Sequence, residues 1–468
     1  MKSTMRLLVA AAIFGTMIPN AGALELVKND KLTLITYGRA QMIGVGQYVP
    51  DPYRDHMRVY LFMKQARLGF KGLYEDVKFD TQFAFGGENA NGNNNDLGML
   101  DFVADIPLKK LGEDTWFKIG QFRVPYSREG LTDTGYMDYA SRSVANLASF
   151  QSRDYGLALL ATKGVWTGTV GTFSSGGRDV PQRYLPERLG LPYLVTRFGY
   201  NDGFDEDIYH VKSAVLDVDR TAKAVMINAI YMQDTLIGHS SALQSRTIDK
   251  NLLIDSGFNP YINAGGGPGL GTIGGTQTLQ RGNMWWLGAD AAIRRPLGKD
   301  KSVSGEVEGN WGGYQNRYGV IHAANARAQV AYQVNPFSIG VRYGALFLDR
   351  KSGFLTTSAT GTGTAAGGTV NRVINNGLGA PIHEITPAMT WHFKGHNMKL
   401  VADLPIIINC PLWYDRMGTA LPLGSQPVGA YAFPDPTSTT QNSVLATPGN
   451  ETARRTVVQG RMMFQFMF

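Results

Sequence analysis

The chain ends in Val458-Gln459-Gly460-Arg461-Met462-Met463-Phe464-Gln465-Phe466-Met467-Phe468, and this stretch decides the fold. Side chains of an extended strand alternate between its two faces. One face therefore carries Met462, Phe464, Phe466 and Phe468, and the other carries Gln459, Arg461 and Gln465. An apolar, aromatic face opposite a polar face is typical of a strand that crosses a bilayer in a β-barrel.

Both ends of the chain indicate export to the bacterial outer membrane. Lys2 and Arg6 precede the apolar stretch Leu7 to Ile18, which is followed by Pro19 and Ala21-Gly22-Ala23. This order predicts a signal peptide over residues 1–23, cut after Ala23, because the apolar stretch is too short for a membrane anchor. The terminal aromatics resemble the assembly signal of outer-membrane proteins, so barrel assembly machinery and outer-membrane lipid are expected partners. The residues that would carry this signal are Phe464, Phe466 and Phe468.

Composition excludes several classes of protein. The 468 residues include 56 glycines, 11% aromatic residues and only 18% charged residues, which favours an all-β protein over a charged or disordered one. The formal net charge is +7, but no run of Lys or Arg indicates a nucleic-acid partner. A single cysteine, Cys410, excludes an intramolecular disulfide and a cysteine-based zinc site. No cofactor and no metal ion are expected.

The pattern of residues 24–468 predicts a transmembrane antiparallel β-barrel of about sixteen strands, a size that leaves an aqueous lumen. The predicted strands are Leu32–Gly46, Met57–Leu73, Val77–Phe85, Leu97–Pro107, Thr115–Val124, Asp154–Lys163, Val165–Ser175, Tyr209–Asp219, Ala222–Gln233, Met284–Arg295, Ser302–Gly312, Val320–Gln333, Phe337–Asp349, Ala380–Phe393, Asn397–Ile408 and Thr452–Phe468. Tight breaks such as Lys163-Gly164 and Arg220-Thr221 alternate with long ones such as Gly176–Ile208. Short periplasmic turns and long extracellular loops have this asymmetry.

Alternation also predicts which charged side chains face the lumen. A charge on the lipid side costs about 2–4 kcal/mol for Arg or Lys at the middle of the bilayer, so charged residues are assigned to the inner face. The expected pore-lining bases are Arg39, Arg67, Arg294, Arg327, Arg342, Lys399 and Arg461, and the expected acids are Asp80, Asp101, Asp290, Glu306, Glu308, Glu384 and Asp403. Lys64 has the wrong parity beside Arg67, which predicts a bulge.

The connection at residues 125–153 differs from the other long connections. Charged residues are spread along the whole connection, and its stretch Met137–Phe150 has few glycines. It either folds inward and narrows the pore or lies on the surface as a solvated loop, and the sequence leaves both interpretations open. If it folds inward, the candidate constriction residues are Arg123, Arg128, Arg142 and Arg153.

Three motifs resemble the phosphate-selective porin O/P family. They are Arg67-Leu68-Gly69-Phe70-Lys71-Gly72, Gly120-Gln121-Phe122-Arg123-Val124-Pro125-Tyr126-Ser127 and Arg153-Asp154-Tyr155-Gly156. The resemblance is firmest over the first third of the chain. It implies a sixteen-stranded barrel, commonly a homotrimer, that passes small solutes. The family members that select phosphate have a ladder of arginines, whereas the predicted lumen has as many acids as bases, so weak or no anion preference is expected.

The sequence is compatible with three classes of function. The leading expectation is passive diffusion of small hydrophilic solutes or anions through a water-filled barrel. A barrel enzyme would need a nucleophile beside a histidine base, but His322 and His383 fall on the predicted lipid face and no such group assembles, so no enzyme is expected. A structural or adhesive barrel that presents long loops is the alternative, and ion conductance would distinguish it from a pore.

Overall fold

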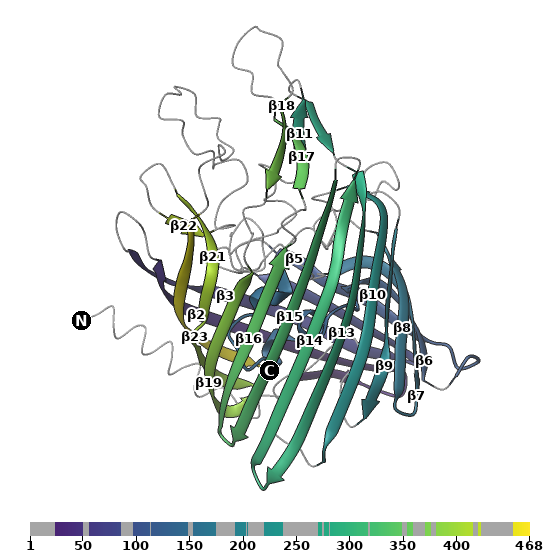
Figure 1. The fold of residues 1–468 in the computed structure, drawn as a ribbon. Helices are drawn as coiled ribbons and strands as arrows, with labels where there is room; N and C mark the ends of the chain where they lie inside the picture. The colour runs from purple at the N-terminus through teal and green to yellow at the C-terminus, as the bar shows by residue number, and fades with distance from the viewer. Residues whose placement is uncertain are drawn as a thin grey trace.

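A computed structural model shows a closed antiparallel β-barrel (Figure 1). It describes residues 24–49, 56–85, 97–112, 114–147, 153–174, 192–202, 204, 220–236, 270–273, 276–279, 281–316, 319–348, 353–358, 370–375, 381–414, 420–422 and 453–468. The wall strands are β2 (Leu32–Val49), β3 (His56–Tyr74), β4 (Val77–Phe85), β5 (Leu97–Pro107), β6 (Thr115–Arg123), β7 (Arg153–Lys163), β8 (Trp166–Phe173), β9 (Tyr193–Asp202), β10 (Ala222–Leu236), β13 (Arg281–Gly298), β14 (Lys301–Asn316), β15 (Gly319–Val334), β16 (Phe337–Leu348), β19 (Ile382–His396), β20 (Met398–Asp403), β21 (Ile406–Tyr414) and β23 (Ala453–Met467).

The wall closes between its first and last strands. Each strand pairs with the next one along the chain, and β23 pairs back onto β2 from Arg39↔Met467 to Tyr48↔Val458. At the seam Gly38 and Phe468 exchange backbone N–H···O hydrogen bonds of 3.0 Å in both directions. With β20 and β21 counted as one interrupted strand, the described residues form a barrel of 16 strands, which confirms the predicted fold class.

Six short strands lie outside this count. They are β1 (Leu24–Lys28), β11 (Leu270–Ile273), β12 (Thr276–Leu279), β17 (Gly353–Ser358), β18 (Val370–Asn375) and β22 (Ala420–Pro422). β1 pairs with residues Thr33 to Thr36 of β2, next to the part of β2 that β23 covers. The described helices are short pieces between β6 and β7, namely α2 (Arg128–Leu131), η1 (Thr134–Tyr136) and η2 (Val144–Leu147). No helix among the described residues has the length and apolar character needed to cross a membrane.

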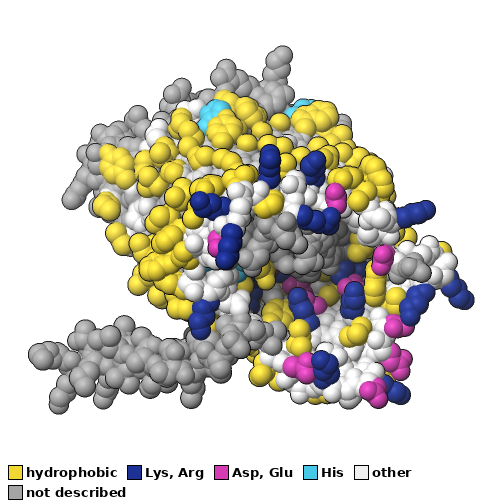
Figure 2. All heavy atoms as spheres, turned by 90° about the horizontal axis from the view of Figure 1, so that it is seen from below, with side chains coloured by type: hydrophobic (Ala, Val, Ile, Leu, Met, Phe, Trp, Pro, Cys, Tyr) yellow, Lys and Arg dark blue, Asp and Glu magenta, His cyan; other side chains and the backbone are white. Residues whose placement is uncertain are grey.

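The strands form because apolar residues alternate with polar ones over most of their length. In β16, Ile339 and Val341 are exposed on the outer face, whereas Arg342 is fully buried on the inner one. Figure 2, seen from the end with the short turns, shows hydrophobic side chains over the outer wall and charged side chains around a hollow. The alternation predicted for the last strand is confirmed, since Met462, Phe464 and Phe468 are exposed and Gln465 is buried.

The prediction of a continuous connection over Gly176–Ile208 is wrong. The structure has β9 at Tyr193–Asp202, inside the stretch Gly176–Ile208 that is expected to be a long connection. Arg220-Thr221 is consequently not a tight turn, because the chain passes from Asp202 to Ala222 over residues 203–221. The predicted strand Tyr209–Asp219 lies outside the described residues. β9 escapes detection because its buried inner face includes the apolar side chains of Tyr193 and Val195, so its two faces hardly differ in polarity.

Two further strands depart from regular alternation. The predicted strand Asn397–Ile408 is interrupted at Leu404-Pro405, where proline has no N–H to donate and Leu404 donates instead to the Pro387 carbonyl at 3.0 Å. In β6 the alternation is broken at Gly120, whose φ is 130°. Lys118 and Gln121, three residues apart, are consequently both buried, which explains why alternation does not assign clear sides to this strand.

Candidate functional site

After β6 the chain turns into the barrel, and we call residues 124–146 the inward segment. Most of its side chains are buried, and Val124, Tyr126 and Tyr139 are at most 1% exposed. The segment begins with α2, whose first turn is capped by the Ser127 hydroxyl accepting from Gly130 N at 3.1 Å. Its hydrogen bonds reach inner-face residues of β2, β3, β10, β13, β14, β16, β19, β20 and β23, which surround more than half of the lumen.

Glu129 is the centre of a buried ion network on the side of β15, β16 and β19. Its carboxylate lies 3.3 Å from Arg342 and 3.8 Å from Arg327. Arg342 also contacts Glu384 at 2.7 Å, and Arg327 contacts Glu306 at 2.9 Å. Because every one of these side chains is buried, each charge is compensated by its partners rather than by water.

Arg128 and Arg142 hold α2 from two directions. The Nε of Arg128 lies 3.1 Å from the Asp290 carboxylate, which also receives two hydrogen bonds from Arg197, at 2.6 and 3.0 Å. Arg142 donates to the carbonyl oxygens of Glu129, Gly130 and Thr132, at 3.1, 3.3 and 3.1 Å. Arg128 therefore joins the segment to the wall, whereas the contacts of Arg142 join two parts of the segment.

Four arginines gather on the opposite side and form what we call the arginine cluster: Arg39, Arg67, Arg123 and Arg153. Arg39 stands opposite Arg67 in the β2–β3 register, and Arg123 stands opposite Arg153 in the β6–β7 register. Asp133 of the inward segment forms ion pairs with Arg39 and, at 3.3 Å, with Arg123. Asp101 accepts from Arg153 at 2.9 Å, and Gln82 accepts from Arg67 at 3.3 Å.

The arginine cluster determines the charge state of Asp133. Burial alone would raise the pKa of this carboxyl, but the guanidinium groups of Arg39 and Arg123 outweigh it and hold the pKa well below its ordinary value. Asp133 is therefore ionised throughout the neutral and mildly acidic range. The four guanidinium groups are accompanied by the carboxylates of Asp133 and Asp101, so the cluster carries an excess of positive charge.

Asp138 has a different environment in the same segment. Its Oδ1 accepts from Ser338 at 3.2 Å, and its Oδ2 is buried without a hydrogen-bond partner among the described residues. Burial raises the pKa of the Asp138 carboxyl to about 6, with Lys399 opposing the shift and Glu306 adding to it. Lys399 itself donates to the Met137 carbonyl at 2.7 Å.

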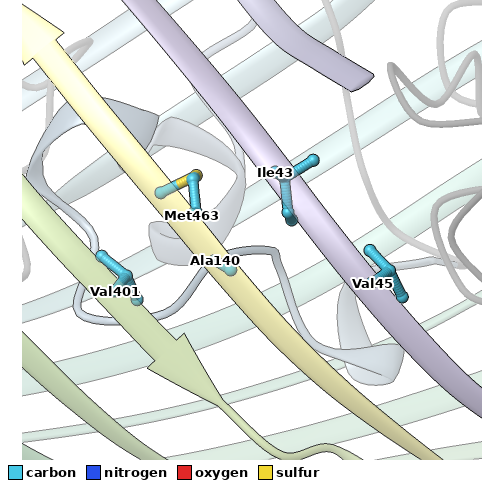
Figure 3. Packing of buried hydrophobic residues seen from close by; sticks show 5 residues of the cluster. All are labelled: Ile43, Val45, Ala140, Val401 and Met463. Carbon is cyan, nitrogen blue, oxygen red and sulfur yellow. The ribbon is translucent and has the colours of Figure 1, made fainter. Parts of the chain in front are cut away.

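Apolar contacts fix the segment against the seam of the barrel. Ala140 packs with Ile43 and Val45 of β2, Val401 of β20 and Met463 of β23, and all five are buried (Figure 3). These inner-face positions are apolar where a lumen wall is expected to be polar.

A bulge in β3 brings a lysine onto the same part of the segment. The β2–β3 register shifts between Gln41 and Met42, so the bulge predicted at Lys64 is confirmed. Lys64 Nζ donates to the Ala140 carbonyl and, at 2.8 Å, to the Ser141 hydroxyl.

The remaining predicted lumen residues also have partners inside the barrel. Asp403 and Arg461 form a double ion pair at 2.6 and 2.7 Å, and Asp403 also accepts from Ala140 N at 2.9 Å. Glu308 accepts from Glu129 N at 2.9 Å. Asp80 accepts from the Tyr37 hydroxyl at 2.6 Å, and Arg294 stacks on Phe204. The predicted lumen residues are thus on the inner face; their role as pore lining stays a prediction.

The sequence does not predict several residues that are central to the site. Alternation does not identify Arg197 because it does not identify β9, and Phe204 lies in a stretch that is predicted to be a loop. Glu129 and Asp133 were visible as acids of residues 125–153, but no sequence pattern pairs them with arginines on distant strands. Within the described ranges, no group of three or more His, Cys, Asp or Glu side chains is placed to hold a metal ion.

Comparison with known proteins agrees with this architecture. Residues 37–190 match the family model of phosphate-selective porins O and P, which confirms the resemblance seen in the sequence over that segment. An anion-selective porin from Comamonas acidovorans is similar in structure, with a TM-score of 0.52, 11% identity and coverage of 94% of this chain and 100% of that chain. OmpT, an outer membrane protein of Vibrio cholerae, gives a TM-score of 0.50 at 9% identity, with 94% and 99% covered. No curated protein sequence matches the chain.

Proposed function

We propose, from the match of residues 37–190 to the phosphate-selective porins O and P, that the chain is an outer-membrane porin. Its barrel lets small hydrophilic solutes and ions diffuse passively across the membrane. The observation that carries this proposal is the inward segment, a compact and charged piece of chain fixed inside a closed barrel. Such a piece narrows an aqueous lumen and brings charged side chains close to whatever passes.

The contacts of the inward segment indicate where solutes would pass. Its hydrogen bonds run along the wall from β10 round to β3, whereas on the arc from β4 to β9 the bonds among the described residues come from Arg123 of β6, which donates to the Leu131 carbonyl at 2.7 Å. Asp101, Gln121 and Arg153 are inner-face residues of this arc, and Arg123 stands at its border with the segment. We place the permeation path there, between the inward segment and β4 to β9.

The arginine cluster borders this path and supports a modest preference for anions. Four guanidinium groups and two carboxylates leave a net positive charge, and charge in a narrow aqueous path raises the local concentration of ions of opposite sign. Along β13 to β19, by contrast, arginines such as Arg327 and Arg342 pair with glutamates. We therefore expect this chain to select phosphate more weakly than a porin with a continuous ladder of arginines.

We also propose how the chain matures and assembles. A signal peptide over residues 1–23 is supported by the sequence, in which Lys2 and Arg6 precede a short apolar stretch and Ala21-Gly22-Ala23. Residues 1–23 themselves lie outside the described residues. The family resemblance supports a homotrimer, and the exposed Phe464 and Phe468 support recognition by barrel assembly machinery.

Planar-bilayer recording of the folded chain tests the function. Discrete conducting steps are expected, with a zero-current potential in a salt gradient that is displaced toward the anion. The double variant R123Q/R153Q removes two positive charges from the path and should reduce this displacement, whereas K109Q, which changes an exposed lysine paired with Asp76, should not. Folded protein that gives no conducting steps would contradict the porin proposal and favour a structural barrel that presents its loops.

A further inference from the structure

The connection that follows β9 sends an aromatic side chain into the barrel. Phe204 lies two residues beyond the end of β9, yet it is only 7% exposed. It packs with Ala222, Ala224 and Ala292, which are all buried. Ala224 and Ala292 stand opposite each other in the β10–β13 register, and Ala222 stands opposite the inner-face residue Arg294. Three small side chains on an inner face that is otherwise largely polar leave room for one ring, and we call them the alanine socket.

The ring in the alanine socket also contacts two cations. The guanidinium carbon of Arg294 lies 4.1 Å from the ring centroid, and that of Arg128 lies 5.3 Å from it. Guanidinium groups are attracted to the face of an aromatic ring, and the attraction is stronger where water is excluded. Arg128 belongs to the inward segment and Arg294 to the wall, so Phe204 connects the two.

The charge around the ring is predominantly positive. Arg128 and Arg197 share one carboxylate, that of Asp290, and Arg294 lies four residues further along β13. The glutamate next to the socket on β14, Glu306, is paired with an arginine of β15. A ring that covers two of the three guanidinium groups therefore controls how much positive charge a passing anion meets.

We propose that Phe204 is a second constriction residue, which docks from the short-turn end of the barrel on β10 and β13, next to the β9 border of the proposed permeation path. There it sets both the width of the lumen and its anion preference at the level of Arg128 and Arg294. The inference deepens the proposed function, on which its statement about ions rests. The docking itself depends only on the alanine socket and the two stacked guanidinium groups.

Conductance measurements test the effect on ions. F204A opens the socket and uncovers both guanidinium groups, so a larger single-channel conductance and a zero-current potential shifted further toward the anion are expected. F204L fills the socket but has no aromatic face. Its conductance should therefore be nearer to that of the wild type, and its zero-current potential should show part of the shift expected for F204A. F85A, a change at an exposed phenylalanine of β4, is the matched control and should leave both unchanged. Wild-type conductance and potential in F204A would overturn the inference.

Thiol labelling tests the docking without any conduction. In a C410S background, A224C places a thiol beneath the Phe204 ring, where it should react slowly with a maleimide added to the folded protein. Adding F204A should raise the labelling rate several-fold. Equal rates with and without Phe204 would overturn the docking, whatever the channel does. If the thiol of A224C is protected but neither the wild type nor any variant conducts, the proposed function and the ion effect fail, and the docking stands.

Discussion

The guanidinium of Arg342 lies 3.3 Å from the carboxylate of Glu129, although 213 residues separate the two in the sequence. Arg342 stands on β16, whereas Glu129 lies in α2 of the inward segment. Both side chains are at most 4% exposed, and Arg342 also holds Glu384 at 2.7 Å. The pair therefore joins the inward segment to the far wall at a place that water hardly reaches.

Removing Arg342 should loosen the inward segment. R342A leaves the carboxylates of Glu129 and Glu384 without this partner, and loss of one member of a buried ion pair costs about 3–5 kcal/mol. In a urea titration R342A should unfold at a lower urea concentration than the wild type, and its open-channel current noise should be larger. R220Q is the control, since the Arg220–Asp202 pair is 65% and 37% exposed, and an exposed pair contributes about 0–1 kcal/mol. Equal stability of R342A and R220Q would contradict the structural role of the pair.

Replacing Asp133 should increase anion preference. D133N removes the carboxylate that contacts Arg39 and Arg123 and leaves their positive charge next to the permeation path. The zero-current potential in a salt gradient should move further toward the anion. Because the pKa of Asp133 is held well below its ordinary value, this difference from the wild type should persist between pH 7 and pH 5. D76N, at an exposed turn, is expected to behave as the wild type, and a cation shift in D133N would refute the placement of the path.

Acidification should increase the stability of the fold through protonation of Asp138. A carboxyl whose pKa is raised to about 6 in the folded state takes up a proton there before it does so in the unfolded chain. Folding stability therefore rises as the pH falls through 6, and this gain is complete below the ordinary pKa near 4. Between pH 7.5 and pH 5 the thermal unfolding midpoint of the wild type should rise relative to that of D138N. Parallel pH profiles of the two proteins would show that Asp138 does not titrate in this range.

Gly120 should not tolerate a side chain. Its φ is 130°, and a Cβ at this position would lie 2.0 Å from the Phe102 carbonyl oxygen. G120A is therefore expected to reduce the yield of folded, heat-modifiable barrel on a gel. G98A is the matched control, because a Cβ at Gly98 meets nothing within 4 Å. Normal yield from G120A would mean that β6 can pair with β5 without this bend.

Alternation along the sequence is enough to predict the barrel and the side of most charged residues. It succeeds where the two faces differ, as in β16 and β23, and it fails in β9, where Tyr193 and Val195 are apolar on the inner face. What alternation cannot supply is the partner of each lumen charge. Glu129 lies in the inward segment and Arg342 on β16, and only the folded path of the segment brings them together.

The seam between Gly38 and Phe468 imposes an order on the formation of the barrel. β2 is the first wall strand to be synthesised and its partner β23 is the last, so the edge of β2 must wait for nearly the whole chain. In the closed barrel β1 pairs with the stretch from Thr33 to Thr36, and β23 pairs with the stretch from Arg39 to Tyr48. Unpaired strand edges associate readily with other chains. A chain cut short before β23 would keep this edge open, so completion of synthesis is a precondition for a barrel that no longer attracts other strands.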